Sequence, residues 1–175
     1  MPSPACDYPL LDFSKPCPCP TFRVINDGVM GGSSVSRVEL TEAGLRFEGH
    51  VSLANNGGFA SFRGPIDIPA RASALRVTVR GDGKRYKLTL KRDDSPMTPQ
   101  YQAVFIAASA WRTLRFVPSD FVPSFRGRAV DAPALRFGDA RHFGLLIGEK
   151  QAGPFRIELE SVRWEQSHAT EGDPS

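Results

Sequence analysis

Along most of the chain, apolar and polar residues alternate with a period of two. Such alternation is typical of a β-strand with one face in a core and the other in solvent. It is clearest in the segments 45–53, 75–79, 86–90 and 155–159, which we therefore predict to be strands. The predicted core positions are Leu45, Phe47, Gly49, Val51, Leu53, Leu75, Val77, Val79, Tyr86, Leu88, Leu90, Phe155, Ile157 and Leu159.

The alternation changes phase by one residue after Leu159, because the apolar positions resume at Val162 and Trp164. One extra residue in a strand has this effect, since it returns the following side chains to the core face. We therefore predict a β-bulge near Glu160 and Ser161.

Helices are not predicted. No window shows a sustained helical period, and 15 prolines and 16 glycines interrupt the chain. The sequences NNGG (55–58) and GDGK (81–84) are typical of turns, since Gly and Asn accept a positive φ. Each is predicted to close a hairpin or a similarly tight connection. Many short strands with such turns indicate an all-β sandwich or barrel with little helix.

The composition indicates a folded domain. With 41% hydrophobic and 23% charged residues among 175, the chain can bury a core, and no apolar run reaches the roughly 18 residues that a membrane helix needs. A net charge of +3 without a clustered basic element does not indicate nucleic-acid binding. We divide the chain into a Pro/Cys-rich arm (1–20, with a first strand starting near 10–13), a sandwich domain (21–165) and a polar tail (166–175).

The first residues, MPSPACDYPL, lack the basic and apolar regions of a secretory signal and the arginines of a mitochondrial presequence. We therefore expect a cytoplasmic location, in a bacterium. The arm carries Cys6, Cys17 and Cys19. Their spacing would strain a bridge between the last two and offers too few ligands for zinc, so free thiols are expected.

The segment INDGVMGGSSVSR (25–37) raises the question of a phosphate or metal loop. A phosphate loop leads into a helix and carries a lysine, whereas this one leads into an alternating segment. Asn26 and Asp27 could supply oxygens to calcium together with Glu158 or Glu160. Such residues more often bond their own backbone in a turn, and we favour that interpretation.

No catalytic constellation is found in the sequence. There is no Gly-x-Ser-x-Gly elbow. His50 lies on the outward face of its predicted strand, His142 opens another strand, and His168 lies in the tail. Asp93 and Asp94 are typical of a solvated loop. We therefore predict neither an enzyme nor a bound cofactor.

A basic face is predicted around GDGK. If the flanking strands pair as a hairpin, Arg76, Thr78 and Arg80 share one surface with Lys87, Thr89 and Lys91. That surface would carry cations without acids, unless a loop such as the one at Asp93 and Asp94 approaches it. An anionic partner surface is the predicted ligand, and an ordinary solvated face is the alternative.

Six motifs, in order, resemble those of the complex I intermediate-associated protein family. They are FRVINDGVMGGSSVS, NNGGFASFRG, LRVTVRGDGKRYKLTL, YQAVF, WRTLRFVPSDFVPSFRG and FGLLIGEKQAGPFRIELESVRW. The resemblance extends from about Leu10 to Trp164. The sequence differs in having Phe22 where the family often has Trp, and in its Cys-Pro arm.

The resemblance implies a galactose-binding-like jelly roll of two antiparallel sheets. It also implies a non-catalytic module that binds a protein partner, as mitochondrial members do when they help to assemble NADH:ubiquinone oxidoreductase. The candidate binding residues come from the glycine-rich loops and, in addition, from the basic face. The loop candidates are Asn26, Asp27, Met30, Asn55, Asn56, Phe59 and Arg63.

Carbohydrate recognition is the alternative function. Sugar sites need exposed aromatic platforms beside hydrogen-bonding side chains, and Tyr86, Tyr101, Gln102 and Trp111 are the candidates. The alternation places Tyr86 on the core face, which weakens this alternative. A dinucleotide-dependent enzyme is a third alternative that the glycine pattern does not favour.

Overall fold

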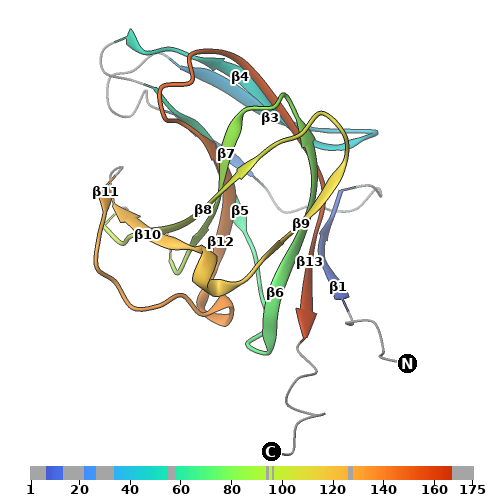
Figure 1. Ribbon diagram of the computed structural model, residues 1–175, viewed down its shortest axis with the longest axis vertical. Coiled ribbons are helices and arrows are strands. Elements are labelled where there is room, and N and C mark those ends of the chain that lie inside the picture. The colour runs from blue at the N-terminus through green and yellow to red at the C-terminus, as the bar shows by residue number, and fades with distance from the viewer. Residues whose placement is uncertain are drawn as a thin grey trace, which may run out of the picture.

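The computed structural model describes residues 7–13, 22–26, 34–54, 58–93, 95, 97–125 and 128–166. Two antiparallel β-sheets pack against each other (Figure 1). Within the described residues there is no α-helix, and two short 3₁₀ turns are η3 (Pro118–Asp120) and η4 (Phe137–Asp139). Over the same ranges, no helix has the length and apolarity that a bilayer crossing needs. The all-β sandwich predicted from the sequence is confirmed.

The first sheet, sheet A, is organised around its longest strand, β13. In β13, residues Gly153 to Leu159 pair with β4 and residues Ser161 to Glu165 pair with β1, and β6 runs along the other side. The strand order is β3, β4, β13, β6, β9, with β1 also on β13. The strands are β1 (Asp7–Asp12), β3 (Val35–Thr41), β4 (Gly44–Val51), β6 (Ala72–Gly81), β9 (Arg112–Phe116) and β13 (Gly153–Gln166).

The second sheet, sheet B, has the order β11, β10, β8, β7, β12, β5, β2. β7 and β12 lie at its centre, and β8 and β5 flank them. The strands are β2 (Arg23–Asn26), β5 (Ala60–Pro65), β7 (Arg85–Lys91), β8 (Gln100–Ile106), β10 (Val122–Phe125), β11 (Arg128–Ala129) and β12 (His142–Ile147). His142 opens β12, as predicted.

The core lies between the sheets and is rich in aromatic rings. Phe47 of sheet A meets Phe62 of sheet B edge-on, with ring centroids 5.0 Å apart. Of the predicted core positions all but two are buried. Gly49 is half-buried, and Leu53 is exposed because β4 ends at Val51.

Phe22, the position at which the sequence differs from the family pattern, packs at the edge of this core. Its ring lies 5.7 Å from the rings of Phe13, Phe62 and Phe143. A Cβ added to Gly64 would lie only 2.1 Å from Cδ1 of Phe22. Glycine at position 64 therefore leaves the space that this ring occupies.

The predicted bulge is confirmed. The pairing of β13 with β6 shifts between Leu159 and Ser161. The extra residue, Glu160, offers its carbonyl oxygen to the N–H of Phe13 at 2.8 Å. As a result Leu159 and Val162 both face the core, each with 1% of its surface exposed.

GDGK forms the tight connection predicted for it, but the two strands that it joins do not pair as a hairpin. β6 belongs to sheet A and β7 to sheet B, so the connection at Asp82–Lys84 passes from one sheet to the other. The turn chemistry was read correctly, because Gly83 has φ +82°. NNGG likewise lies between β4 and β5, which belong to different sheets, and its residues 55–57 fall outside the described residues.

Candidate functional site

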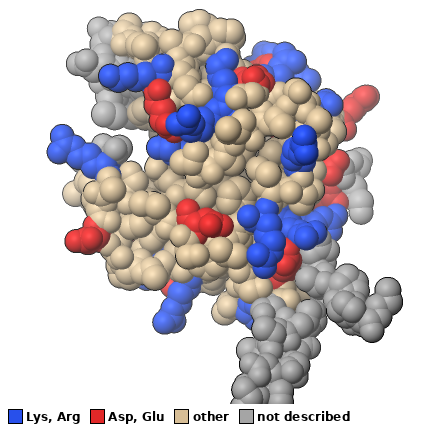
Figure 2. Space-filling model, viewed as in Figure 1, with Lys and Arg blue, Asp and Glu red and all other residues tan. Residues whose placement is uncertain are grey.

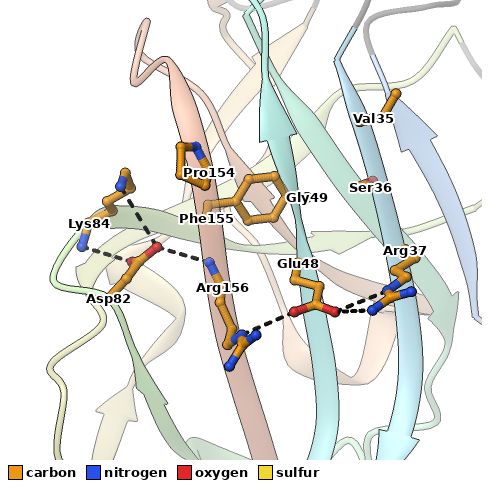
Figure 3. A pocket seen from close by; sticks show the side chains of 10 residues that line it. All are labelled: Val35, Ser36, Arg37, Glu48, Gly49, Asp82, Lys84, Pro154, Phe155 and Arg156. Carbon is orange, nitrogen blue, oxygen red and sulfur yellow. Dashed lines mark hydrogen bonds and ion pairs between the residues drawn. The ribbon is translucent and has the colours of Figure 1, made fainter.

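A groove of about 710 Å³ lies at one end of sheet A, over β3, β4 and β13 and beside the β6–β7 connection. Figure 3 shows Arg37, Glu48 and Arg156 in a row across these three strands, with Val35 and Pro154 farther along β3 and β13. The lining residues are Val35, Ser36, Arg37, Glu48, Gly49, Asp82, Lys84, Pro154, Phe155 and Arg156.

Strand register creates the charged row in this groove. Arg37 is the register partner of Glu48, and Glu48 is that of Arg156. Arg37 donates to Glu48 Oε2 from Nε at 3.0 Å and from Nη2 at 2.7 Å, and Arg156 Nε donates to Oε1 at 3.0 Å. The hydrogen bond from Arg37 outweighs partial burial and lowers the pKa of Glu48. One carboxylate thus holds two arginines in place.

Asp82 connects this groove to both sheets. Its carboxylate accepts hydrogen bonds from the N–H of Lys84 at 3.1 Å, from the Tyr86 hydroxyl at 3.1 Å and from the N–H of Arg156 at 2.9 Å. Tyr86 lies in β7 of sheet B and Arg156 in β13 of sheet A. Burial, and after it the Asp82 carboxylate, raises the pKa of the Tyr86 phenol. This phenol therefore stays protonated and donates to Asp82.

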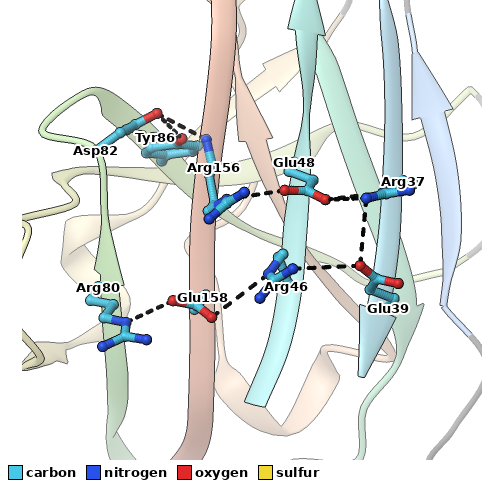
Figure 4. A network of polar contacts seen from close by, with 9 residues as sticks. All are labelled: Arg37, Glu39, Arg46, Glu48, Arg80, Asp82, Tyr86, Arg156 and Glu158. Atoms are coloured by element: carbon cyan, nitrogen blue, oxygen red, sulfur yellow. Dashed lines mark hydrogen bonds and ion pairs between the residues drawn. The ribbon is translucent and has the colours of Figure 1, made fainter. Parts of the chain in front are cut away.

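A second charged row crosses sheet A next to the first (Figure 4). Arg80 Nε donates to Glu158 Oε1 at 2.6 Å, and the Arg80 guanidinium lies 4.7 Å from the ring centroid of Trp111. Arg46 lies between Glu158 and Glu39, with N–O separations of 3.8 and 3.7 Å. These separations are too long for hydrogen bonds, and Arg46 Nε has no hydrogen-bond partner among the described residues.

A third cluster lies farther along β13. Glu165 accepts hydrogen bonds from Nε of Arg76 in β6 and from Nε of Arg115 in β9, the latter at 3.1 Å. The Glu165 side chain is only 6% exposed. Burial alone would raise its pKa, but the hydrogen bonds from Arg76 and then Arg115 outweigh burial, so the pKa of Glu165 is lowered.

The basic face predicted around GDGK does not exist as one surface. Arg76 and Arg80 lie on sheet A and pair with Glu165 and Glu158, whereas Lys87 and Lys91 lie on sheet B. Lys91 is also not solvated. It is 4% exposed, and its ammonium donates to Ser95 O and to Thr98 O and Oγ1 in the following loop.

Most of the loop candidates cannot be placed. Asp27, Met30, Asn55 and Asn56 lie outside the described residues. Asn26 ends β2 opposite Ala60, and nothing is described of its side chain. Phe59, just before β5, and Arg63, in β5, are both half-buried on sheet B. The groove on sheet A contains none of the predicted loop residues, as its lining shows.

The aromatic residues considered for sugar binding are not available as platforms. Tyr86 is fully buried and Tyr101 is 1% exposed. Trp111 is half-buried and has the Arg80 guanidinium over its ring. Gln102 lies on sheet B and donates to Gln100, so it does not share a surface with Trp111.

Sequence reasoning did not identify Arg37, Glu48 and Arg156 as a site. Each stands at an outward position of an alternating segment, and that was the only signal available. Their meeting depends on which strands are neighbours. For the calcium alternative, Glu158 lies between Arg46 and Arg80, and the described residues contain no cluster of three or more His, Cys, Asp or Glu side chains placed to hold a metal.

Comparisons with known proteins give a family and a fold. The family model of complex I intermediate-associated protein 30 matches residues 11–159. An uncharacterised protein of Schizosaccharomyces pombe is 25% identical over 169 residues, which cover 81% of this chain and 76% of that protein.

Among solved structures, this fold is similar to that of two carbohydrate-binding modules. One is a family 11 module from Clostridium thermocellum, solved with a β-1,3-1,4-mixed-linked tetrasaccharide. It has a TM-score of 0.60 at 11% identity, covering 94% of this chain and 98% of the module. The other is a family 29 module, with a TM-score of 0.53 at 11% identity and 91% of both chains covered. The sandwich is therefore of the galactose-binding-like type.

Proposed function

Because the chain belongs to the complex I intermediate-associated protein 30 family, we propose that it is a non-catalytic assembly module that binds a protein partner during assembly of a respiratory membrane complex. The observation that carries this proposal is the family match over residues 11–159, which includes nearly all of the described sandwich.

The groove on sheet A supports the proposal as a docking surface. Val35 is 62% exposed, and the side chains of Arg37 and Arg156 are 69% and 60% exposed. Arginines beside apolar side chains are typical of the energetically important part of protein interfaces. Glu48 already holds both guanidinium groups, so a partner does not have to order them.

The carboxylates of this face favour binding over proton transfer. Arginines lower the pKa of both Glu48 and Glu165. A general acid or base works best when its pKa lies near the operating pH, and these two carboxylates are shifted in the opposite direction. The proposal accordingly involves neither catalysis nor a cofactor.

The first test combines an affinity tag, crosslinking in the source cells and quantitative mass spectrometry. We expect subunits of the NADH:ubiquinone oxidoreductase to be enriched over a tag-only sample. In the variant Val35→Glu, which replaces an exposed apolar contact of the groove by a charged side chain, their yield should fall at least about tenfold, which corresponds to about 1.4 kcal/mol.

Leu40→Glu is the matched control, because Leu40 lies on the same strand, is 52% exposed and does not line the groove. It should leave the yield unchanged. Equal yields from both variants would exclude the groove as the docking surface. A capture without respiratory-chain proteins would exclude the assembly function itself.

Carbohydrate binding is the alternative, and it rests on the similarity to carbohydrate-binding modules, which concerns the fold alone. The burial of Tyr86 and Tyr101 removes the aromatic platforms considered for it. A glycan array distinguishes the two functions. Saturable binding of one glycan class, lost in Val35→Glu but not in Leu40→Glu, would replace the protein-binding proposal.

A further inference from the structure

β8 is an incompletely paired strand near the edge of sheet B. On one side β7 pairs with it from Tyr101 to Ile106. On the other side β10 pairs only with Gln100 to Gln102. Residues 103–106 therefore have one side without a neighbouring strand in the described part of the chain, and we call this stretch the open edge.

The backbone groups of Val104 and Ile106 point out of the open edge. Ala107, which follows β8, donates its N–H to Lys84 O at 3.0 Å across the β7–β8 pair. Hydrogen-bonded and non-hydrogen-bonded positions alternate in an antiparallel pair, so Phe105 and Ala103 also bond to β7, whereas Val104 and Ile106 point away. Pro123 of β10 lies opposite Tyr101, whose backbone groups point toward β7 and not toward β10. Because proline has no N–H to donate, its place opposite this position agrees with the assignment.

The described residues provide no other partner for these groups. No hydrogen bond from a described loop or side chain reaches the backbone of Val104 or Ile106. An open strand edge with N–H and C=O groups free is a template for pairing with another extended chain.

A cleft of about 450 Å³ lies beside the open edge. Figure 1 shows β8 and β9 running apart from their connection, with β10 returning alongside β8. The residues that line the cleft come from β8, β9, η3 and β10, and they are Gln102, Ala103, Val104, Arg115, Phe116, Asp120 and Val122. One extended strand fits this arrangement, because β9 and η3 flank the position that it would take.

Exposed apolar side chains surround the same edge. Val104 is 55%, Ile106 63% and Val122 55% exposed. β-branched residues at an open edge are normally avoided or protected by charges. Figure 2, drawn from the same side as Figure 1, shows a middle region with much surface that is neither basic nor acidic. The side chains of Val104, Ile106 and Val122 stay in solvent unless a partner covers them.

The charges near the open edge favour an acidic partner. Lys87 is the register partner of Val104, and Arg112 begins β9. Among the described residues neither has an ion pair within 4.0 Å. Asp120 is the one acid in the cleft lining, and it accepts a hydrogen bond from the N–H of Val117. A partner strand with acidic side chains would therefore gain charge complementarity.

We propose that the open edge of β8 binds an extended segment of a partner protein as an added strand, and that this segment alternates apolar with acidic residues. Two backbone positions, Val104 and Ile106, supply the hydrogen bonds, and Val104, Ile106 and Val122 supply apolar contacts. The proposal rests on the protein-binding function proposed above but not on the groove of sheet A. A second copy of this chain fits less well, because its own β9 would accompany its β8 into the cleft.

The first experiment measures amide hydrogen exchange by NMR on the full chain. The N–H groups of Val104 and Ile106 should exchange at least about tenfold faster than those of Ala103 and Phe105, since only the latter bond to β7. Equal protection at all four positions would show that the edge is not open.

The second experiment selects binders from a phage-displayed library of random decapeptides. Selected peptides should alternate apolar and acidic residues, slow the exchange of the Val104 and Ile106 amides, and lose at least about tenfold in affinity for Val104→Pro, which removes one outward N–H. Val104→Thr is the matched comparison, because it keeps both the N–H and the branched shape and replaces only one methyl group by a hydroxyl, so it should lose less affinity than Val104→Pro.

Several outcomes would overturn the proposal. The first is that the library yields no enriched peptides. The second is that the selected peptides bind Val104→Pro as tightly as Val104→Thr. The third is that light scattering shows the natural chain to be a dimer and Val104→Pro to be a monomer, which would assign the edge to a second copy of the chain. If Val104→Pro does not fold, Ile106→Pro removes the next outward N–H and takes its place. Failure of the groove test with Val35→Glu leaves these results unaffected, so the two proposals fail separately.

Discussion

Glu165 is a carboxylate that is nearly excluded from water and lies between two arginines. Its pKa is lowered in the folded chain from a usual value near 4.5, so its ion pairs stabilise the fold above about pH 4.5, and this contribution is lost as the pH falls through the lowered pKa. Replacing it with glutamine should therefore lower the free energy of unfolding at pH 7 by about 1–3 kcal/mol. In urea denaturation, the difference from the natural chain should shrink below about pH 4.5.

Glu160→Gln is the control for this prediction. It makes the same chemical change in the same strand, where the described residues place no arginine or lysine within 4.0 Å of the carboxylate. Its stability should follow that of the natural chain across the pH range. If the free energy of unfolding of Glu165→Gln differed from that of the natural chain by the same amount from pH 7 to pH 3, the role assigned to the ion pairs would be contradicted.

The β6–β7 connection is the element in which one side chain joins both sheets. Asp82→Ala would leave the buried Tyr86 hydroxyl without its acceptor, at a cost of about 1–3 kcal/mol in the free energy of unfolding. Removing that hydroxyl first should reduce the cost, so Asp82→Ala should be less harmful in a Tyr86→Phe background. Chemical denaturation of the two single variants and the double variant measures this coupling.

If the losses in the free energy of unfolding of Asp82→Ala and Tyr86→Phe add up to the loss of the double variant, the contact between Asp82 and Tyr86 contributes nothing of its own. Asp82→Asn gives a further check, because it keeps one acceptor oxygen while removing the charge. Its loss of stability should lie between that of the natural chain and that of Asp82→Ala.

The β6–β7 connection also shows what the alternating pattern of a sequence can predict and what it cannot. Alternation specifies which side chains face the core, and it was right at Leu75, Val79 and Leu88 and at the bulge after Leu159. It carries no information about which strand lies next to which. A short turn such as GDGK suits a hairpin and a passage between sheets equally well, and the pairing of β6 with β7, on which the predicted basic face depended, does not occur.

The candidate site depended on this missing information. Glu158 lies 78 positions from Arg80 in the sequence, and the pair forms only because β13 lies beside β6. Lys91 faces outward by its alternation, yet the loop that contains Ser95 and Thr98 covers it. Long-range pairing and loop coverage therefore decide which predicted cations remain in solvent.

At the scale of the whole molecule, the charges of sheet A and the apolar edge of sheet B are different kinds of surface. The outer face of sheet A is crossed by rows in which arginines and glutamates neutralise one another. The open edge of β8 instead offers backbone groups and exposed valine and isoleucine. Under the two proposals above, sheet A would hold one partner by side-chain complementarity, and the open edge of β8 would hold another by backbone pairing.

The position of β13 also determines when this domain can fold during synthesis. β1 and β4 both pair with β13, so neither can pair with it until β13 has been synthesised. The pairing of Asp7 with Glu165 spans almost the entire described chain. While a ribosome is still making the first 150 or so residues, sheet A lacks its centre, and the alternating segments 45–51 and 75–79 expose their apolar faces. Until β13 has left the ribosome, these apolar faces have no partner strand at the centre of sheet A, so the nascent chain is more exposed to aggregation than the finished domain.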